Sequence, residues 1–194
     1  MNDAKFSTLI AILDSLRKEA PNSPEFARFH SKKTEDITFS RGQSFIHLFL
    51  LVKFGLETFG KRNEHICDGP NDGGLDGWYI SESHKTVYLI QSKFRHSSKD
   101  FATTSIPATD LIKMEFEEIL EGNVKDSLGT PYNSKVLQFQ LALKSGFKTA
   151  TPCRVFPQWG HTGNGTIGSI FSASVFSCII GYRPILSQLC YYPN

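Results

Sequence analysis

Hydrophobic and polar positions follow a helical period over most of this chain. Apolar residues three or four positions apart predict amphipathic helices over residues 4–20, 110–121 and 133–144. A nearly continuous apolar run predicts a helix buried on most sides over residues 43–59. Ser23 precedes Pro24 and is expected to be the N-cap of a further short helix.

A strict alternation of apolar and polar residues replaces the helical period in the middle of the chain. Trp78 and Ile80 alternate with polar neighbours, as do Val87 and Leu89, and residues 81–85 are rich in turn formers. This pattern predicts a β-hairpin.

The remaining segments are expected to be one more strand and loops. Residues 64–68 are predicted to be a strand, residues 32–40 a linker and residues 96–109 a polar loop. Near the end of the chain, residues 170–173 and 175–180 are alternative strands. Together the elements predict an α/β fold in which helices flank a small mixed β-sheet.

Candidate chemistry is concentrated at the ends of the predicted hairpin. Asp76 lies at the start of the first strand, and Gln91 and Lys93 lie at the end of the second. Because Gln91 and Lys93 are two positions apart, they project from the same face, roughly 6–7 Å apart along the strand. A carboxylate, an amide carbonyl and an ammonium group therefore converge, which is suitable for holding a divalent metal beside a phosphate.

The oxygen ligands present favour Mg²⁺, with Mn²⁺ as the alternative. Asp76, Gln91 and the backbone carbonyl of Ser92 are the expected metal ligands, and Lys93 is expected to act on the attacking water or the phosphate. A calcium-binding loop of the EF-hand type starting at Asp68 is excluded, because its twelfth position is Tyr79 rather than glutamate.

Each of these residues also has an ordinary structural explanation. The run Asp72-Gly73-Gly74 is common turn material, and a lysine at the end of an edge strand often protects the edge against aggregation. The combination of Asp76 with Gln91 and Lys93 in this order is what favours a functional site.

The segments Gly-Gly-Leu-Asp76-Gly and Gln91-Ser-Lys93-Phe resemble the signature of PD-(D/E)xK nucleases in its Gln-x-Lys variant, as in Mrr-like enzymes. The longer segment from Asp68 to Arg95 is more similar to the N-terminal domain of abortive-infection phage-resistance (AIPR) proteins. The resemblance implies a restriction-endonuclease-like core and a metal-dependent endonuclease that acts on DNA, with RNA as the alternative. It also implies a role in phage defence.

Residues around the motif are expected to contact nucleic acid. Gly73 and Gly74 lack a Cβ and permit close approach of a nucleic-acid backbone, and Arg95, His96 and Lys99 are available to contact phosphates. Nucleases of this kind are often dimeric for double-strand cutting, so a homodimer is included among the expected partners.

One part of the family pattern is absent. Many Mrr-like enzymes carry a glutamate after the phenylalanine of a Gly-x-x-Phe-Glu pattern, whereas the matching run here, Gly42-Gln-Ser-Phe-Ile46, ends in isoleucine. Glu57, Glu64 and Asp72 are the local substitutes as a supporting acid. The missing acid favours the alternative of a catalytically silent module that binds nucleic acid or a partner.

Length and charge divide the chain into three parts: N-terminal helices over residues 1–40, a nuclease-like core over residues 41–146 and an atypical tail over residues 147–194. All nineteen acidic residues lie within residues 1–126 beside sixteen lysines and arginines, which gives −3. The last 68 residues carry five basic residues and no acidic ones, which gives +5.

The tail allows three interpretations. Residues 162–182 lack charges, yet they are too rich in glycine, serine and threonine for a membrane span, so no membrane association is expected. The two alternative strands are the second interpretation. The third is a tail that no longer encodes native structure, as in a truncated relic of a longer AIPR-like protein. The four scattered cysteines and the lack of a signal peptide predict a reducing, cytoplasmic location.

Overall fold

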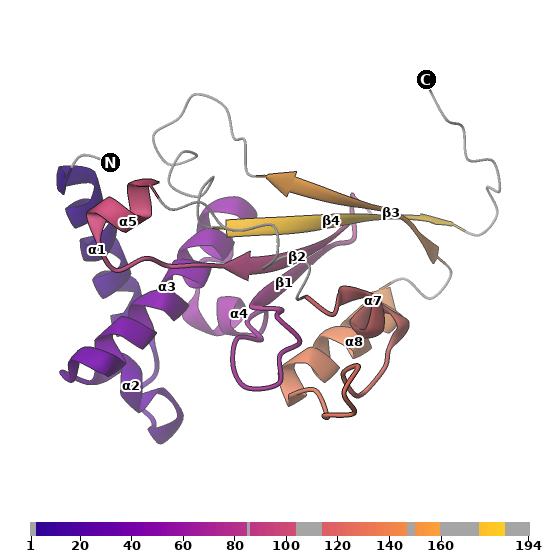
Figure 1. Cartoon of the computed structure of the whole chain (residues 1–194), viewed down its shortest axis with the longest axis horizontal. Coiled ribbons are helices and arrows are strands. Elements are labelled where there is room, and N and C mark those ends of the chain that lie inside the picture. Colours follow the sequence, from indigo (N-terminus) through magenta and orange to yellow (C-terminus); the bar gives the residue numbers. More distant parts are fainter. Residues whose placement is uncertain (1–2, 85, 104–113, 147–149, 160–174, 185–194) are drawn as a thin grey trace.

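A β-hairpin between two groups of helices forms the centre of the computed structural model (Figure 1). The predicted α/β class is therefore confirmed. The structure describes residues 3–84, 86–103, 114–146, 150–159 and 175–184.

The N-terminal helices form as the apolar period predicts. They comprise α1 (Asp3–Leu16), η1 (Arg17–Glu19), η2 (Pro24–Phe26) and α2 (Ala27–His30). Ser23 is the N-cap of η2, as predicted, although its hydroxyl makes no capping hydrogen bond. Its backbone carbonyl instead accepts the N–H of Phe26 at 3.0 Å, which closes the 3₁₀ turn.

The long helix α3 spans Thr34–Phe54, so the predicted linker over residues 32–40 is wrong. Glu35 and Asp36 lie in its first turn, where their negative charge interacts favourably with the helix dipole. The helix ends before Gly55, which has a φ of 69° and donates its N–H to Leu51 at 2.9 Å. The short helix α4 (Phe59–Asn63) follows as a separate element.

The hairpin consists of β1 (Gly77–Ser81) and β2 (Thr86–Ser92), as predicted, with Trp78 opposite Leu89. Its two faces belong to different hydrophobic clusters. Val87 and Leu89 contact a cluster that includes α8, whereas Ile90 belongs to the cluster of α1 and α3. Figure 1 shows the hairpin between α3 on one side and α7 with α8 on the other.

The predicted strand over residues 64–68 is wrong, since only an isolated bridge between Ile66 and Gly77 forms there. The N–H groups of Cys67 and Asp68 both donate to the carbonyl of Asp76, at 2.9 and 3.1 Å. Two donors that share one acceptor cannot continue a regular ladder, because successive strand residues bond in alternate directions.

The helices after the hairpin match the predictions only in part. Helix α5 (Ser98–Thr103) occupies part of the expected polar loop, and α7 (Phe116–Glu121) is shorter than the expected helix over residues 110–121. Residues 104–113, which complete both predictions, lie outside the described residues. The prediction of a helix over residues 133–144 is confirmed by α8 (Ser134–Gly146).

Two strands, β3 (Ala150–Trp159) and β4 (Val175–Pro184), extend the hairpin into a sheet of order β1-β2-β4-β3. All three pairings among the described strands are antiparallel, so the predicted mixed sheet is wrong for this part of the chain. A parallel pair requires a long crossover, whereas β1 and β2 are joined by a short turn. The alternative strand over residues 175–180 is confirmed by β4, and residues 170–173 lie outside the described residues.

No helix within the described ranges is long and apolar enough to cross a membrane.

Candidate functional site

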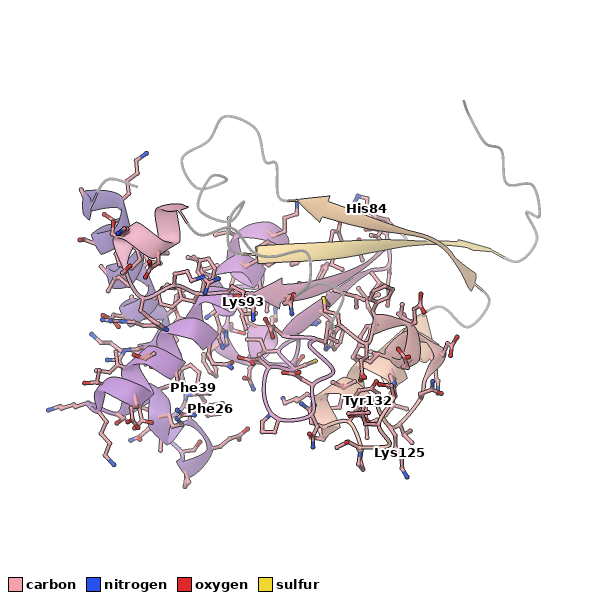
Figure 2. The ribbon with its side chains drawn as sticks, viewed as in Figure 1. Phe26, Phe39, His84, Lys93, Lys125 and Tyr132 are labelled. Atoms are coloured by element: carbon pink, nitrogen blue, oxygen red, sulfur yellow. The ribbon has the colours of Figure 1, made fainter. Side chains whose placement is uncertain are left out.

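A pocket of about 340 Å³ lies where β2 ends against α3. Asp76, Gln91, Ser92 and Lys93 all line it, so the structure brings together the four residues that the sequence predicts as ligands and catalytic groups. Figure 2 labels Lys93 just beyond the end of β2.

Asp76 is fixed in place by its own backbone. Its N–H donates to the carbonyl of Ile90 at 3.0 Å, and its carbonyl accepts from Cys67 and Asp68. The backbone N–H of Ser92 donates to the Asp76 carboxylate. The side chain is therefore held beside the end of β2 before any ligand arrives.

The electrostatic surroundings of Asp76 are unfavourable for a negative charge. Burial raises the pKa of this carboxyl to about 8, and repulsion by Asp68 adds to the effect, while the Ser92 N–H and Lys93 act in the opposite direction. Burial, assisted by Asp72, also raises the pKa of Asp68. A bound cation would relieve both carboxylates of this cost.

Three carboxylates meet beside the pocket, and two of them, Asp68 and Asp76, line it. Asp68, Asp72 and Asp76 each offer an oxygen within 4.8 Å of the others. Asp72 mainly builds the turn, because its carboxylate accepts the N–H of Gly74 at 2.8 Å and that of Gly69 at 3.0 Å. The Asp68 carboxylate accepts a hydrogen bond from the Gln43 amide of α3.

Gln91 supplies an independent indication of a ligand. Its side chain is 6% exposed, and its Oε1 atom is buried without a hydrogen-bond partner among the described residues. Leaving a buried acceptor unpaired costs about 1–3 kcal/mol. Of the five buried polar atoms without a partner in the described ranges, only this one belongs to a residue that lines the pocket. An amide oxygen beside carboxylates fits a hard divalent cation such as Mg²⁺ or Mn²⁺.

The predicted supporting acids differ in their positions. Asp72 belongs to the carboxylate cluster, whereas Glu57 and Glu64 are exposed and do not line the pocket. The two glycines predicted to approach nucleic acid have structural roles. At Gly73 a side chain is excluded by packing, since a Cβ there would lie 2.9 Å from the side chains of Ile119 and Tyr132. Gly74 has a φ of 76° and donates to Asp72, so it completes the same turn.

Only one of the three cationic residues predicted after β2 lines the pocket. This residue is His96, which is exposed, whereas the preceding residue, Arg95, is partly buried and is not among the lining residues. Lys99 is exposed on α5 and is not among the lining residues. The structure thus brings His96 to the predicted ligands but not Lys99.

Asn133 connects the acidic loop to α8. Its side-chain amide donates to the carbonyls of Cys67 at 3.0 Å and Pro70 at 3.2 Å. Its Oδ1 atom accepts the N–H groups of Lys135 and Val136 at the start of α8. One side chain therefore caps a helix and anchors the loop that carries Asp68.

Several lining residues are not predicted from the sequence as part of the site. Asp68 enters there only as the start of the excluded calcium loop and of the resembling segment, and Gln43 only within the apolar helix and the compared run over residues 42–46. Thr38, Gly42 and Ile46 line the pocket at a helical spacing of four. That spacing would have placed them on one face if the helix had been extended through residues 34–42.

No family model matches the chain, and no curated protein or solved structure matches it either. The resemblance to PD-(D/E)xK nucleases therefore stays a prediction.

We predict that replacing Asp76 by asparagine stabilises the metal-free protein at alkaline pH. An unfolded aspartate has a pKa of about 3.9. Between about pH 4 and pH 8 the folded protein keeps a proton that the unfolded chain has released, so the free energy of unfolding falls as pH rises through this window. Asp76→Asn should remove most of this dependence and add about 1–3 kcal/mol of stability at pH 8.5.

Urea unfolding in EDTA at several pH values measures this effect. Glu82→Gln, at an exposed position in the hairpin turn, is the matched control and should leave the slope unchanged. Parallel stability curves for wild type and Asp76→Asn would show that Asp76 is ionised normally in the folded protein.

Proposed function

We propose that this chain is a metal-dependent nuclease, with a restriction-endonuclease-like core, that hydrolyses phosphodiester bonds of DNA or RNA. The observation that carries the proposal is that Asp76, Gln91 and Lys93 line one pocket, and that the buried Gln91 Oε1 has no hydrogen-bond partner among the described residues. A role in phage defence and a homodimeric state remain part of the proposal on the basis of the sequence resemblance alone.

The expected ligands of the metal are the Asp76 carboxylate, the Gln91 amide oxygen and the carbonyl of Ser92. When bound, Mg²⁺ or Mn²⁺ supplies Lewis-acid chemistry to phosphate oxygens and lowers the pKa of water. Asp68 lies close enough to Asp76 to add negative charge to the same site.

Lys93 provides the positive charge of the chain itself in the pocket. An ammonium group beside the ligands stabilises the negative charge that develops on phosphate oxygens as the bond to the leaving oxygen breaks. Because Lys93 follows the end of β2 directly, its backbone is held by the same strand that positions Gln91.

A second candidate is a catalytically silent module that binds nucleic acid. It is favoured by Ile46, which lines the pocket at the position where the resembled pattern carries an acid and which is only 2% exposed. The pocket then lacks a carboxylate from α3, and Thr38 and Gln43 are the polar residues that this helix contributes there.

Cleavage of supercoiled plasmid and single-stranded DNA in Mg²⁺ or Mn²⁺ tests the proposal. We expect wild type and the matched control Glu82→Ala to cleave, and Asp76→Ala or EDTA to abolish cleavage. Calorimetric titration with Mg²⁺ should show binding to wild type and none to Asp76→Ala. Metal binding without cleavage would favour the silent module, and cleavage that persists in Asp76→Ala would refute the assigned site.

A further inference from the structure

The wall of the pocket contributed by α3 contains a gap. Thr38, Gly42 and Ile46 follow one another at intervals of four along this helix and line the pocket across from the strand end. At Gly42, a Cβ atom added to the backbone would find no other atom within 4 Å. The space beside the helix at this point is thus open and belongs to the pocket.

Glycine in the interior of a helix lowers stability relative to alanine. Folding does not require a glycine here, because a methyl group would fit without a clash and Gly42 has no left-handed backbone conformation. The absence of a side chain instead leaves the helix backbone accessible to a flat group in the pocket.

Aromatic rings border this open space. Phe39 and Phe94 are partly buried and line the pocket, and the exposed His96 ring stands nearly perpendicular to Phe94 at a centroid distance of 5.3 Å. Phe39, labelled in Figure 2 on α3, carries the Arg28 guanidinium 3.6 Å from its ring centroid. Binding of a metal ion and a phosphate does not require aromatic rings, whereas nucleobases stack on them.

The volume also suits a ring. About 340 Å³ falls within the range of roughly 300–1,000 Å³ that is typical of small-ligand sites. The polar ligands Asp76 and Gln91 and the rings of Phe39 and Phe94 share this single space. A nucleotide presents both partners at once, a phosphate for the polar ligands and a base for the aromatic rings.

We propose that the pocket receives an unstacked nucleobase beside the Asp76–Gln91 ligands, so that the substrate class is single-stranded nucleic acid. This inference rests on the proposed nuclease function and deepens it. Bases in a duplex are paired and stacked, and placing one in the pocket would require extruding it from the helix, which costs free energy. A single strand offers its bases without that cost.

Filling the gap at Gly42 tests the proposal. Gly42→Leu places an apolar side chain in the pocket, and Gly60→Leu is the matched control, since a Cβ at Gly60 also meets nothing within 4 Å and Gly60 does not line the pocket. Binding of a fluorescein-labelled single-stranded DNA and of its duplex is measured by anisotropy in Ca²⁺, with intactness of the DNA verified on a gel.

We expect wild type to prefer the single strand, Gly42→Leu to weaken that binding about tenfold or more, and Gly60→Leu to change it by less than about twofold. Circular dichroism and thermal unfolding establish that both variants fold. If Gly42→Leu does not fold, Gly42→Ala replaces it. We expect this variant to have a raised Tm and a smaller loss of single-strand binding.

Unchanged single-strand binding by a folded Gly42 variant would overturn the base pocket, as would an equal loss for duplex and single strand. Either result leaves the nuclease proposal intact if wild type still cleaves DNA in a metal-dependent manner. The converse outcome is that wild type does not cleave DNA, while Gly42→Leu still weakens binding of the single strand. This outcome would refute the nuclease proposal and retain the base pocket.

Discussion

Lys93→Met should slow DNA cleavage about 100- to 1,000-fold while leaving Mg²⁺ affinity nearly unchanged. The methionine keeps the length and apolar stem of the side chain and removes only the ammonium group. Lys93 lines the pocket with Asp76 and Gln91, but its side chain has no oxygen to offer a metal. Its loss therefore removes positive charge at the scissile phosphate, not a ligand.

Single-turnover cleavage and calorimetric Mg²⁺ titration of the same preparations separate these two effects. Lys61→Met, at an exposed lysine of α4 outside the pocket, is the matched control and should cleave like wild type. If Lys93→Met loses metal binding together with cleavage, the lysine supports the structure of the site. If it cleaves normally, Lys93 has no part in the reaction.

The hairpin and the meeting of Asp76 with Gln91 and Lys93 were predictable because both depend on local order. A period of two fixes the two strands, and a short turn brings their ends to the same place. The three residues lie directly at those ends, so no long-range contact had to be known to place them together.

The participation of α3 in the pocket was not predicted, because the helix was expected to begin at residue 43. Thr34, Glu35 and Asp36 resemble a polar linker in composition, yet the two acids stabilise the first turn of the helix. Once the helix begins at Thr34, Phe39 and Gly42 enter the pocket wall.

Residues 64–68 do not form a strand because of contacts with residues distant in sequence, which a local pattern cannot predict. Asp76 uses its carbonyl to accept two N–H groups of this segment, and Asn133 holds the carbonyl of Cys67 from a distant helix. These bonds give the segment a single bridge in place of a strand and bring Asp68 to the site.

The largest effect on stability is expected from Arg62, whose side chain is completely buried. Its guanidinium donates to the carbonyls of Leu56 at 3.1 Å and Glu57 at 2.6 Å and forms an ion pair with Glu19. Its Nε donates to Nδ1 of His47 at 3.3 Å. One side chain thus ties together η1, α3, α4 and the loop between α3 and α4.

His47, which lies beside this arginine, is uncharged and can therefore accept its hydrogen bond. Burial, with repulsion by Arg62 as the second cause, lowers the pKa of His47 to about 3. His47 is therefore neutral at mildly acidic pH and above, and it accepts the hydrogen bond from Arg62. Protonation would place two positive charges side by side in the interior.

Arg62→Leu should lower the free energy of unfolding by about 3–5 kcal/mol, because it leaves two backbone carbonyls, a buried histidine nitrogen and Glu19 without their partner. The matched control is Arg28→Leu, since Arg28 also pairs with a carboxylate, that of Asp36, but is half exposed. Exposed pairs contribute at most about 1 kcal/mol, so this variant should unfold close to wild type in urea. A similar, small loss for both variants would mean that the Arg62 network contributes no more than a surface ion pair. A loss confined to Arg62→Leu would make it the polar centre that joins the N-terminal helices to the helix forming the pocket wall.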